Sequence, residues 1–518
     1  MILALAVAAI AAFSFPVAAD GRYQSRPDLS PPTLNITMPC GGNCSESYLF
    51  VAPFTGYDDP SGFTYFSIWA GNFQAARWKG QPVLFSFEGA HNSLHGHGHG
   101  HHTFLDQNYQ NIRELRSGNH MLSDKHEFIV LNETTALFQI YQPVQKNLRR
   151  YGGTDKQTWI VDARFQEMDI ETGEVLFEWA SLDHVSPDET ALPLPLGQAG
   201  IGHNSSTAWD YFHINSITKG DDGHYLLSAR HSSTIYKING TDGSIIWRLG
   251  GRFSDFTLGD NVTFGFQHHA RYLKGGSGES TEIISLFDNS VYGSESAGGG
   301  DKEVHLYPYS RGKYIKLDHA AHTATLELAF LPPQGPILSK SQGSLQTLPN
   351  GNALINWGSE GQITEYSSSG EPVFHAFLDS GLLQDKLQNY RAFRYNWTGY
   401  SQETLAVLAE KGEGGEVNVY MSWNGDTRTV AWRVSWSKRI GWATIRKTQT
   451  HPKTGFETTI KLTKASSSMG PVSVEALGAD GQVLQVSENV RTELAYWLEP
   501  DTVESTKPQK QVTLNADL

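Results

Sequence analysis

A pattern of four short strands repeats along the middle of this 518-residue chain, and it constrains the fold more than any other feature. The clearest copy runs from His213 to Gly250, where short tracts of alternating polarity are separated by the turns Asp221-Asp-Gly and Thr241-Asp-Gly. Such tracts, with turns at hairpin spacing, are typical of antiparallel strands. Four-stranded units that repeat along one chain indicate an all-β protein of the β-propeller type, with sheets packed radially around a channel.

Three less regular copies of the pattern begin at His126, His268 and Gln342. With further strands expected in residues 47–112, we predict a six-bladed propeller, and five to seven blades fit the same pattern. The first strand of each blade lines the channel in such a fold. Because His126, His213, His268 and Gln342 take nearly the same place in successive units, we expect them to converge on one axis.

The pattern changes after Tyr400. Evenly spaced alternating tracts such as Val417-Asn-Val-Tyr-Met and Val472-Ser-Val-Glu-Ala predict a separate set of strands. Strands of this kind in a region of this length favour a small β-sandwich of the immunoglobulin or fibronectin type. The predicted organisation is a signal peptide or anchor at 1–19, an extended segment at 20–46, a propeller at 47–400, a sandwich at 401–499 and a polar tail at 500–518.

The N-terminal segment has the pattern of a secretory signal. Residues 1–19 are almost wholly apolar and end in the small residues Val17-Ala18-Ala19 before Asp20. No Lys or Arg precedes the apolar run, and its length reaches the lower limit of a membrane span. We therefore expect a secreted protein, with a membrane anchor formed by residues 1–19 as the alternative.

Two further features fit the secretory pathway. Cys40 and Cys44 are the only cysteines and lie close together, so a local disulfide could form in an oxidising compartment. Sequons of the type Asn-x-Ser/Thr, which accept N-linked glycans, begin at Asn35, Asn43, Asn132, Asn204, Asn239, Asn261 and Asn396.

The charge balance limits the partners. Lys and Arg number 40 against 54 Asp and Glu, which gives a net charge of −14 and argues against a nucleic-acid surface. The chain has no Gly-x-x-x-x-Gly-Lys-Ser/Thr motif, so the phosphates of a nucleotide donor have no evident cradle. We expect small-molecule partners, no cofactor, and a membrane contact only if the N-terminal segment stays uncleaved.

Three tracts combine residues that can transfer a group. They are Asp210-Tyr-Phe-His213-Ile-Asn215-Ser, Ser228-Ala-Arg230-His231 and Phe266-Gln-His268-His269-Ala-Arg271. A neutral imidazole can attack an electrophile, while His⁺, Arg and Asn can hold an oxyanion. Around one cavity, these groups would support transfer through a histidine. The alternative is that the histidines are buried channel residues, hydrogen-bonded between blades.

The region from about 50 to 400 resembles the fungal branch of the arylsulfotransferase family, propeller enzymes that use aryl sulfate esters as donors. The matching tracts are Asp124-Lys-His126-Glu-Phe, Phe165-Gln-Glu-Met-Asp-Ile, Glu178-Trp-Ala-Ser-Leu-Asp-His184-Val, Trp209-Asp-Tyr-Phe-His213-Ile-Asn-Ser, Leu227-Ser-Ala-Arg-His231, Ile245-Ile-Trp-Arg-Leu-Gly-Gly, Phe266-Gln-His268, Ser285-Leu-Phe-Asp-Asn and Leu348-Pro-Asn-Gly-Asn.

The resemblance implies that a channel-facing histidine is transiently sulfated, assisted by two other histidines and an arginine. By motif, His268 corresponds to the nucleophile, His213 and Arg230 to sulfuryl-binding residues, and His126 to the remaining histidine. Arg230 would hold the sulfuryl oxygens, and His213 would protonate the leaving oxygen because an unperturbed imidazole titrates near neutral pH. No metal is implied. The expected substrate-binding residues are Asn215, His269, Arg271 and His231.

Two alternative functions use the same scaffold. One is a cofactor-free cyclase or isomerase of a phenolic or polyketide-like metabolite, with the histidines as acid–base groups. The other is a non-catalytic propeller that binds carbohydrate or protein. The histidine-rich run at 91–102 could bind a transition metal, but we interpret it as a surface loop at the propeller mouth.

Overall fold

The computed structural model describes residues 23–29, 33–55, 69–92, 96–273, 280–293, 303–379, 387–412, 416–440, 442–462 and 469–494. The predicted signal or anchor at 1–19 and the polar tail at 500–518 lie outside these residues. The all-β prediction is confirmed, because strands dominate and the one described α-helix, α2 (Ser181–His184), has four residues. The chain divides into two compact units: unit 1 includes Pro27–Gln402, and unit 2 combines Tyr23–Arg26 with the chain from Glu403 onward.

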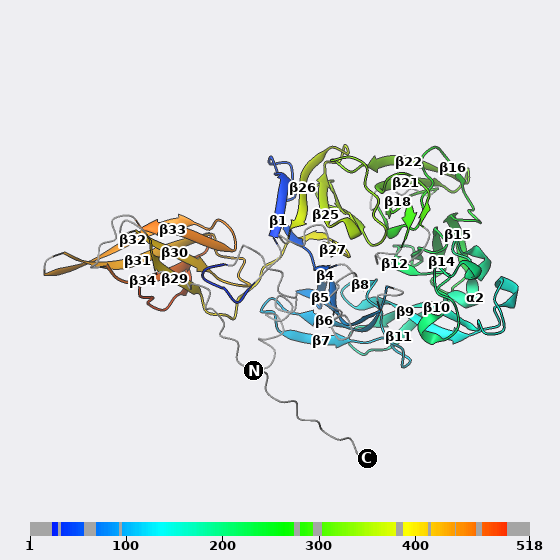
Figure 1. Cartoon of the computed structure of the whole chain (residues 1–518), viewed down its shortest axis with the longest axis horizontal. Coiled ribbons are helices and arrows are strands. Elements are labelled where there is room, and N and C mark those ends of the chain that lie inside the picture. The colour runs from blue at the N-terminus through cyan, green and yellow to red at the C-terminus, as the bar shows by residue number, and fades with distance from the viewer. Residues whose placement is uncertain are drawn as a thin grey trace, which may run out of the picture. The chain divides into compact units, whose positions relative to one another are not determined.

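Five sheets of four or five strands make up most of unit 1, and they follow one another in chain order (Figure 1). The first contains β4 (Trp69–Trp78), β5 (Gln81–Asn92), β6 (His97–Leu105) and β7 (Asn111–Leu115). The second contains β8 (Phe128–Leu131), β9 (Thr135–Gln145), β10 (Trp159–Asp169) and β11 (Val175–Ala180). The third contains β12 (Ile214–Lys219), β13 (Tyr225–Ala229), β14 (Thr234–Ile238) and β15 (Ile245–Gly250).

The fourth and fifth sheets each take in an additional strand. The fourth has the order β16 (Thr257–Leu258), β22 (Thr323–Phe330), β21 (Arg311–Asp318), β18 (Thr281–Asp288) and β17 (His268–Tyr272). The fifth has the order β1 (Thr33–Met38), β26 (Pro372–Asp379), β25 (Gln362–Tyr366), β24 (Ala353–Asn356) and β23 (Ser344–Thr347). The segment predicted to be extended thus provides β1, which joins the last sheet of the unit.

Short pairs and 3₁₀ turns complete unit 1. The two-stranded pairs are β19 (Val291–Tyr292) with β20 (Val304–His305), β2 (Tyr48–Phe50) with β28 (Phe393–Tyr395), and β3 (Pro53–Thr55) with β27 (Leu387–Asn389). The 3₁₀ turns are η1 (Arg149–Tyr151), η2 (Pro187–Glu189), η3 (Leu194–Leu196), η4 (Ser205–Thr207) and η5 (Gly358–Glu360). The predicted disulfide between Cys40 and Cys44 is present.

The four predicted repeats correspond to the second to fifth sheets. Each sheet begins with a short strand close to the expected residue, and in every case the next strand pairs antiparallel with it. Each sheet also shares a hydrophobic core with the next one. For example, Phe165 on β10 packs with Tyr225 on β13, and Phe287 on β18 lies in one cluster with Ile355 on β24. Burial of such large side chains stabilises the packing by about 1.5–3 kcal/mol each.

Unit 2 consists of two four-stranded sheets around one core. One has the order β33 (Glu457–Leu462), β30 (Val417–Ser422), β29 (Ala406–Lys411) and β36 (Glu493–Leu494), and the other β32 (Ala443–Pro452), β31 (Ala431–Ile440), β34 (Met469–Leu477) and β35 (Val483–Val486). Alternation of buried and exposed residues, seen along β33, directs one face of each sheet inward. Across the described part of the chain, helices are too short to cross a bilayer.

Candidate active site

The three predicted catalytic histidines lie at or just before the start of first strands and come close together. His213 directly precedes β12, His268 is the first residue of β17, and His126 lies two residues before β8. The rings of His126 and His213 are 5.0 Å apart between centroids and nearly perpendicular. The Tyr390 ring lies 5.4 Å from that of His126 and 6.5 Å from that of His268. Sheet packing therefore gathers residues that are far apart in the sequence.

Asp210 organises two of the imidazoles. Its Oδ2 accepts hydrogen bonds from Nδ1 of His213 at 2.6 Å and from Nε2 of His97 at 2.8 Å. The backbone of His213 adopts a left-handed conformation with φ of +56°, and its N–H donates to Oδ1 of Asp210 at 3.0 Å. A positive φ in a residue other than Gly is costly, and such strain often accompanies functional sites.

The position of His97 differs from the expectation for the histidine-rich run. Instead of a surface loop, residues 97–102 form the first part of β6, paired with the end of β5. His97 and His102 are buried, and the ring of His102 stacks on Phe128. Alternating Gly residues let two strands approach closely here, because a Cβ at Gly100 would lie 2.1 Å from the carbonyl oxygen of Glu88.

His126 has its own carboxylate. Its Nδ1 donates to Oδ1 of Asp124 at 2.5 Å, and the same oxygen accepts the backbone N–H of His126 at 2.8 Å. The other carboxylate oxygen accepts a hydrogen bond from the backbone N–H of Gly98. Both Asp124 and His126 are buried. The carboxylate therefore orients the ring and leaves Nε2 as the nitrogen that can face a reactant.

Asn289 determines the tautomer of His268. Both N–H groups of the Asn289 amide are used, by the carbonyls of Ser339 at 2.9 Å and of Gln342 at 3.0 Å. Its Oδ1 is consequently an acceptor, and it lies 2.7 Å from Nδ1 of His268. Nδ1 of His268 must then carry the proton, so Nε2 of the neutral ring holds a lone pair.

Arg230 has an unused donor. Its Nη2 donates to the carbonyl of Lys340 at 2.7 Å, and the guanidinium lies 5.0 Å above the ring of Tyr292. Its Nε is buried and has no hydrogen-bond partner among the residues that the structure describes. A buried unpaired donor costs about 1–3 kcal/mol, so an anion that accepted from it would relieve this cost.

Burial keeps three histidines neutral, His126, His213 and His268, which together form the histidine cluster. Burial lowers the pKa of His213 to about 3. Burial also places the pKa of His268 well below its usual value, with a further contribution from Arg230, and acts on His126 together with Lys125. The pKa of His213 therefore lies below the near-neutral value on which its predicted role as a proton donor depends. An anionic ligand would raise these pKa values by favouring the charged rings.

We expect the protein to lose stability as the pH falls below about 6.5, the ordinary pKa of histidine. Between that value and about 3, the unfolded chain binds a proton at His213 that the folded chain does not, so acid favours unfolding. Each such buried histidine should contribute up to about 1.4 kcal/mol per pH unit. Urea midpoints measured at pH 7 and pH 5 test this, and an unchanged midpoint would contradict it.

The four predicted substrate-binding residues mainly contact other parts of the protein. Their nitrogens donate to protein oxygens, and all four side chains are buried or half-buried. The contacts are Asn215 Nδ2 to the carbonyl of Gln267 at 2.6 Å, His269 Nδ1 to the carbonyl of Leu345 at 3.0 Å, Arg271 Nη2 to Glu127 Oε2 at 2.7 Å, and His231 Nδ1 to the carbonyl of Asp210 at 2.6 Å. Only His231 stacks directly on a cluster ring, with its centroid 4.4 Å from that of His213.

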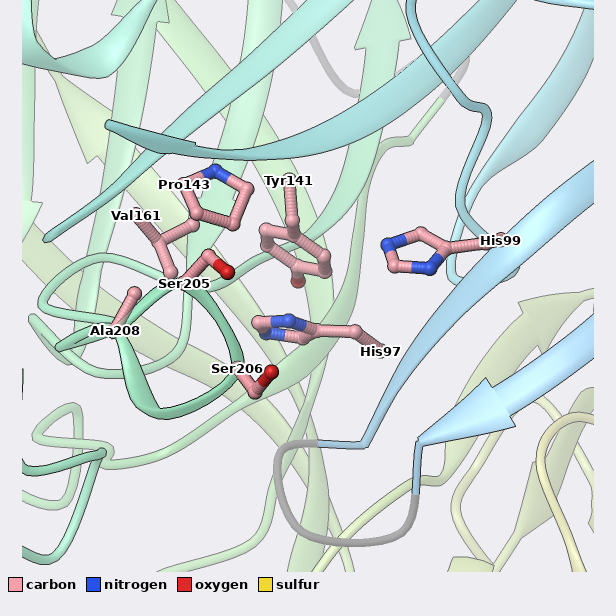
Figure 2. Close-up of a pocket in the computed structure, with 8 residues that line it drawn as sticks. All are labelled: His97, His99, Tyr141, Pro143, Val161, Ser205, Ser206 and Ala208. Atoms are coloured by element: carbon pink, nitrogen blue, oxygen red, sulfur yellow. The ribbon is translucent and has the colours of Figure 1, made fainter. Parts of the chain in front are cut away.

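A pocket of about 180 Å³ opens beside His97. The rings of His97 and Tyr141 stack with their centroids 3.9 Å apart. Figure 2 shows these two rings in the pocket, with His99 to one side. The remaining lining residues are Pro143, Val161, Ser205, Ser206 and Ala208. His97 also shares the carboxylate of Asp210 with His213, so this pocket borders the histidine cluster.

The structure adds residues that sequence analysis did not assign to the site: His97, Asp124, Asp210, Asn289 and Tyr390. A sequence signal existed for two of them, since Asp124 and Asp210 stand two and three residues before their histidines. Asn289 ends the tract Ser285-Leu-Phe-Asp-Asn, and this motif alone assigns it no role. The side chains of His97, Asp210 and His213 could also hold a metal ion, as their ligand atoms lie within 4.8 Å of one another, although no metal was predicted.

Comparison with known proteins agrees with the resemblance seen in the motifs. A family model described as Arylsulfotransferase (ASST) matches residues 74–378. The chain belongs to the arylsulfotransferase family. The matched range contains every histidine of the cluster, Arg230 and Asn289, whereas Tyr390 and unit 2 lie outside it.

Two other comparisons give less information about the family. The search of curated proteins gave no match for this arylsulfotransferase family member. A crystal structure of a protein of unknown function from Bacteroides caccae is similar over 62% of this chain and 87% of its own, with 10% identity and a TM-score of 0.34.

Proposed function

We propose that this protein transfers a sulfuryl group from an aryl sulfate ester to a phenolic acceptor through a sulfo-histidine at His268, without a nucleotide donor. The observation that carries the proposal is the hydrogen bond from Nδ1 of His268 to Asn289, which leaves the lone pair on Nε2. Membership in the arylsulfotransferase family supports the reaction class.

The reaction would proceed in two displacements. Nε2 of His268 attacks sulfur while the sulfur–oxygen bond to the aryl group breaks, and the phenolate leaves with a proton from His213 or His126. In the second step the acceptor oxygen attacks sulfur, the nitrogen–sulfur bond breaks, and the acceptor proton returns to the same imidazole. The transferred group spreads negative charge over its oxygens, so positioned cationic donors supply most of the stabilisation. Bound sulfate ester would raise the pKa of the donor histidine and make it a competent acid.

Arg230 is proposed to bind the sulfuryl oxygens. Its unpaired Nε is a donor that the protein itself does not satisfy within the described residues. A guanidinium can contact two oxygens of such a group at once. The apolar wall formed by Tyr141, Pro143 and Val161 beside His97 is our proposed site for an aryl ring.

We also propose the finer features of the fold. The sheets of unit 1 would be blades of a propeller, and a count of six would require the short pairs β2–β28 and β3–β27 to form a further blade. Unit 2 would be an immunoglobulin- or fibronectin-like sandwich without a role in the chemistry. The disulfide and the sequons support a secreted glycoprotein.

Asn289→Leu should lower kcat because Asn289 fixes the tautomer of His268. Without the acceptor, the ring can place its proton on Nε2 and lose the lone pair that attacks sulfur. A wrong tautomer in a catalytic triad costs about 10⁴, so we expect a loss on the order of 10²–10⁴. Steady-state kinetics would show it, and Asn289→Asp, which keeps an acceptor, should recover part of the rate. Equal losses in both variants at unchanged stability would argue against this role.

The direct test is incubation of the purified protein with a chromogenic aryl sulfate and a phenol acceptor. Phenol release that depends on the acceptor, together with the sulfated acceptor as product, would support the proposal. Absence of release across pH 5–9 would exclude sulfuryl transfer from aryl esters and favour the cyclase or binding alternatives.

A further inference from the structure

The hairpin formed by β31 and β32 in unit 2 is unusually exposed. In the order β32-β31-β34-β35, β32 is an edge strand, and the residues from Ala443 to Thr450 are all exposed. The two strands pair from Ala431↔Pro452 out to Ile440↔Ala443, whereas β34 accompanies β31 only as far as Lys438. Figure 1 shows this hairpin projecting from the body of unit 2.

The end of the hairpin is apolar. Of the described residues at this end, Ile440, Trp442 and Ala443 carry no charge, and Trp442 is 100% exposed. Ile445, close behind it on β32, is 44% exposed. An indole that makes no packing contact with its own protein is a feature of interaction sites rather than of a solvated surface.

The hairpin is also strongly basic, although the whole chain is acidic. Residues 427–456 contain no Asp or Glu, and their basic residues are Arg428, Arg433, Lys438, Arg439, Arg446, Lys447 and Lys453. Two of the basic residues nearer the base are neutralised, because Arg433 pairs with Glu475 at 2.6 Å and Arg428 with Asp426 at 3.0 Å. The four basic residues nearest the tip of the hairpin are Lys438, Arg439, Arg446 and Lys447.

We propose that this hairpin attaches the protein to an anionic lipid surface, with the Trp442 end entering the interface and the basic residues behind it contacting headgroups. Trp is enriched where membrane meets water, and Lys and Arg close to such a residue are attracted by anionic lipids. Charges on an edge strand also prevent pairing with other sheets, but that function does not explain an exposed Trp at the tip. The contact is separate from any anchoring by residues 1–19 and from the proposed catalysis.

The test is co-sedimentation of the full protein with phosphatidylcholine vesicles, with and without phosphatidylserine. We expect binding only to the anionic vesicles and weaker binding at high salt, where charges are screened. Replacing Arg446 and Lys447 together by Ser should weaken binding about 25-fold, since each basic residue near an anionic surface contributes about fivefold. Trp442→Ser should weaken it on the order of tenfold, because part of the indole no longer leaves water. Turnover of substrate in solution should not change.

Matched controls are available in the same unit. Val486→Ser removes an exposed apolar residue on β35, and Lys461→Ser removes an exposed basic residue on β33, so neither should alter vesicle binding. Every variant and the wild type share the same N-terminal segment, so differences between them isolate the hairpin. The proposal is overturned if anionic vesicles do not bind, if binding survives both hairpin changes, if the hairpin instead binds an acidic polysaccharide without lipid, or if it only joins two copies of the chain.

Discussion

His268→Ala is expected to reduce aryl sulfate turnover by several orders of magnitude, as removal of a covalent nucleophile does in other enzymes, where losses reach about 10⁶. The physical reason is that, of the three predicted catalytic histidines, only His268 directs its Nδ1 proton to a neutral amide oxygen, that of Asn289. His126 and His213 instead donate to carboxylates, which suits them to hold or pass a proton. The measurement is kcat with a chromogenic aryl sulfate at saturating acceptor.

His269→Ala is the matched control, because the two neighbours contact different parts of unit 1. His269 has a φ of +56° at a bulge in β17, and its ring bonds to the carbonyl of Leu345. Its replacement should cost much less in kcat. Rapid quenching under mildly alkaline conditions and intact-mass analysis should reveal a sulfuryl adduct on the wild type and none on His268→Ala. An adduct on His269, or turnover with sequential kinetics and no adduct, would show that the assignment is wrong.

Glu127→Gln is expected to destabilise unit 1 by about 3–5 kcal/mol, the usual cost of removing one partner from a buried ion pair. The Glu127 side chain is fully buried and accepts from Arg391 at 2.8 Å and from Arg271 at 2.7 Å. Burial would raise the pKa of Glu127, but the two guanidinium groups hold it below its usual value. Because Arg391 is also fully buried, the Gln variant leaves an uncompensated cation in the core.

Equilibrium urea unfolding of wild type and variant at one pH measures this effect. Glu303→Gln is the control, since Glu303 pairs with Lys340 while both side chains are more than one-third exposed. Exposed pairs contribute between about 0 and 1 kcal/mol. The ion pairs of Glu127 connect the loop before β8 to β17 and to the segment before β28, so their loss should destabilise the whole unit. Equal shifts of the unfolding midpoint in both variants would contradict this role of Glu127.

Local sequence signals were sufficient to predict the strands of the third sheet. The alternation and turns of residues 213–250 led to the four strands β12 to β15, because side-chain period and turn chemistry are properties of neighbouring residues. The disulfide between Cys40 and Cys44 was predictable for the same reason, as only two cysteines exist and they are four residues apart. The expected convergence of first strands also depended on a repeat that is visible in the sequence.

The identity of each hydrogen-bond partner depended on tertiary structure. The histidine-rich sequence predicts a surface loop around His97, yet strand pairing buries His97 and brings its ring to Asp210, more than 100 residues away. Asn215 and Arg271, whose motifs predict substrate binding, hydrogen-bond to Gln267 and Glu127, and no local sequence pattern identifies these partners.

The sequence by itself therefore determined the all-β class, the strand units, the local disulfide and the family motifs, since each depends on residues near one another in the chain. Only the tertiary structure decided which nitrogen of His268 is free, because Asn289 reaches that ring from a different strand end. It also decided that His213 and His268 are neutral, since desolvation acts on their pKa values through packing from several sheets at once.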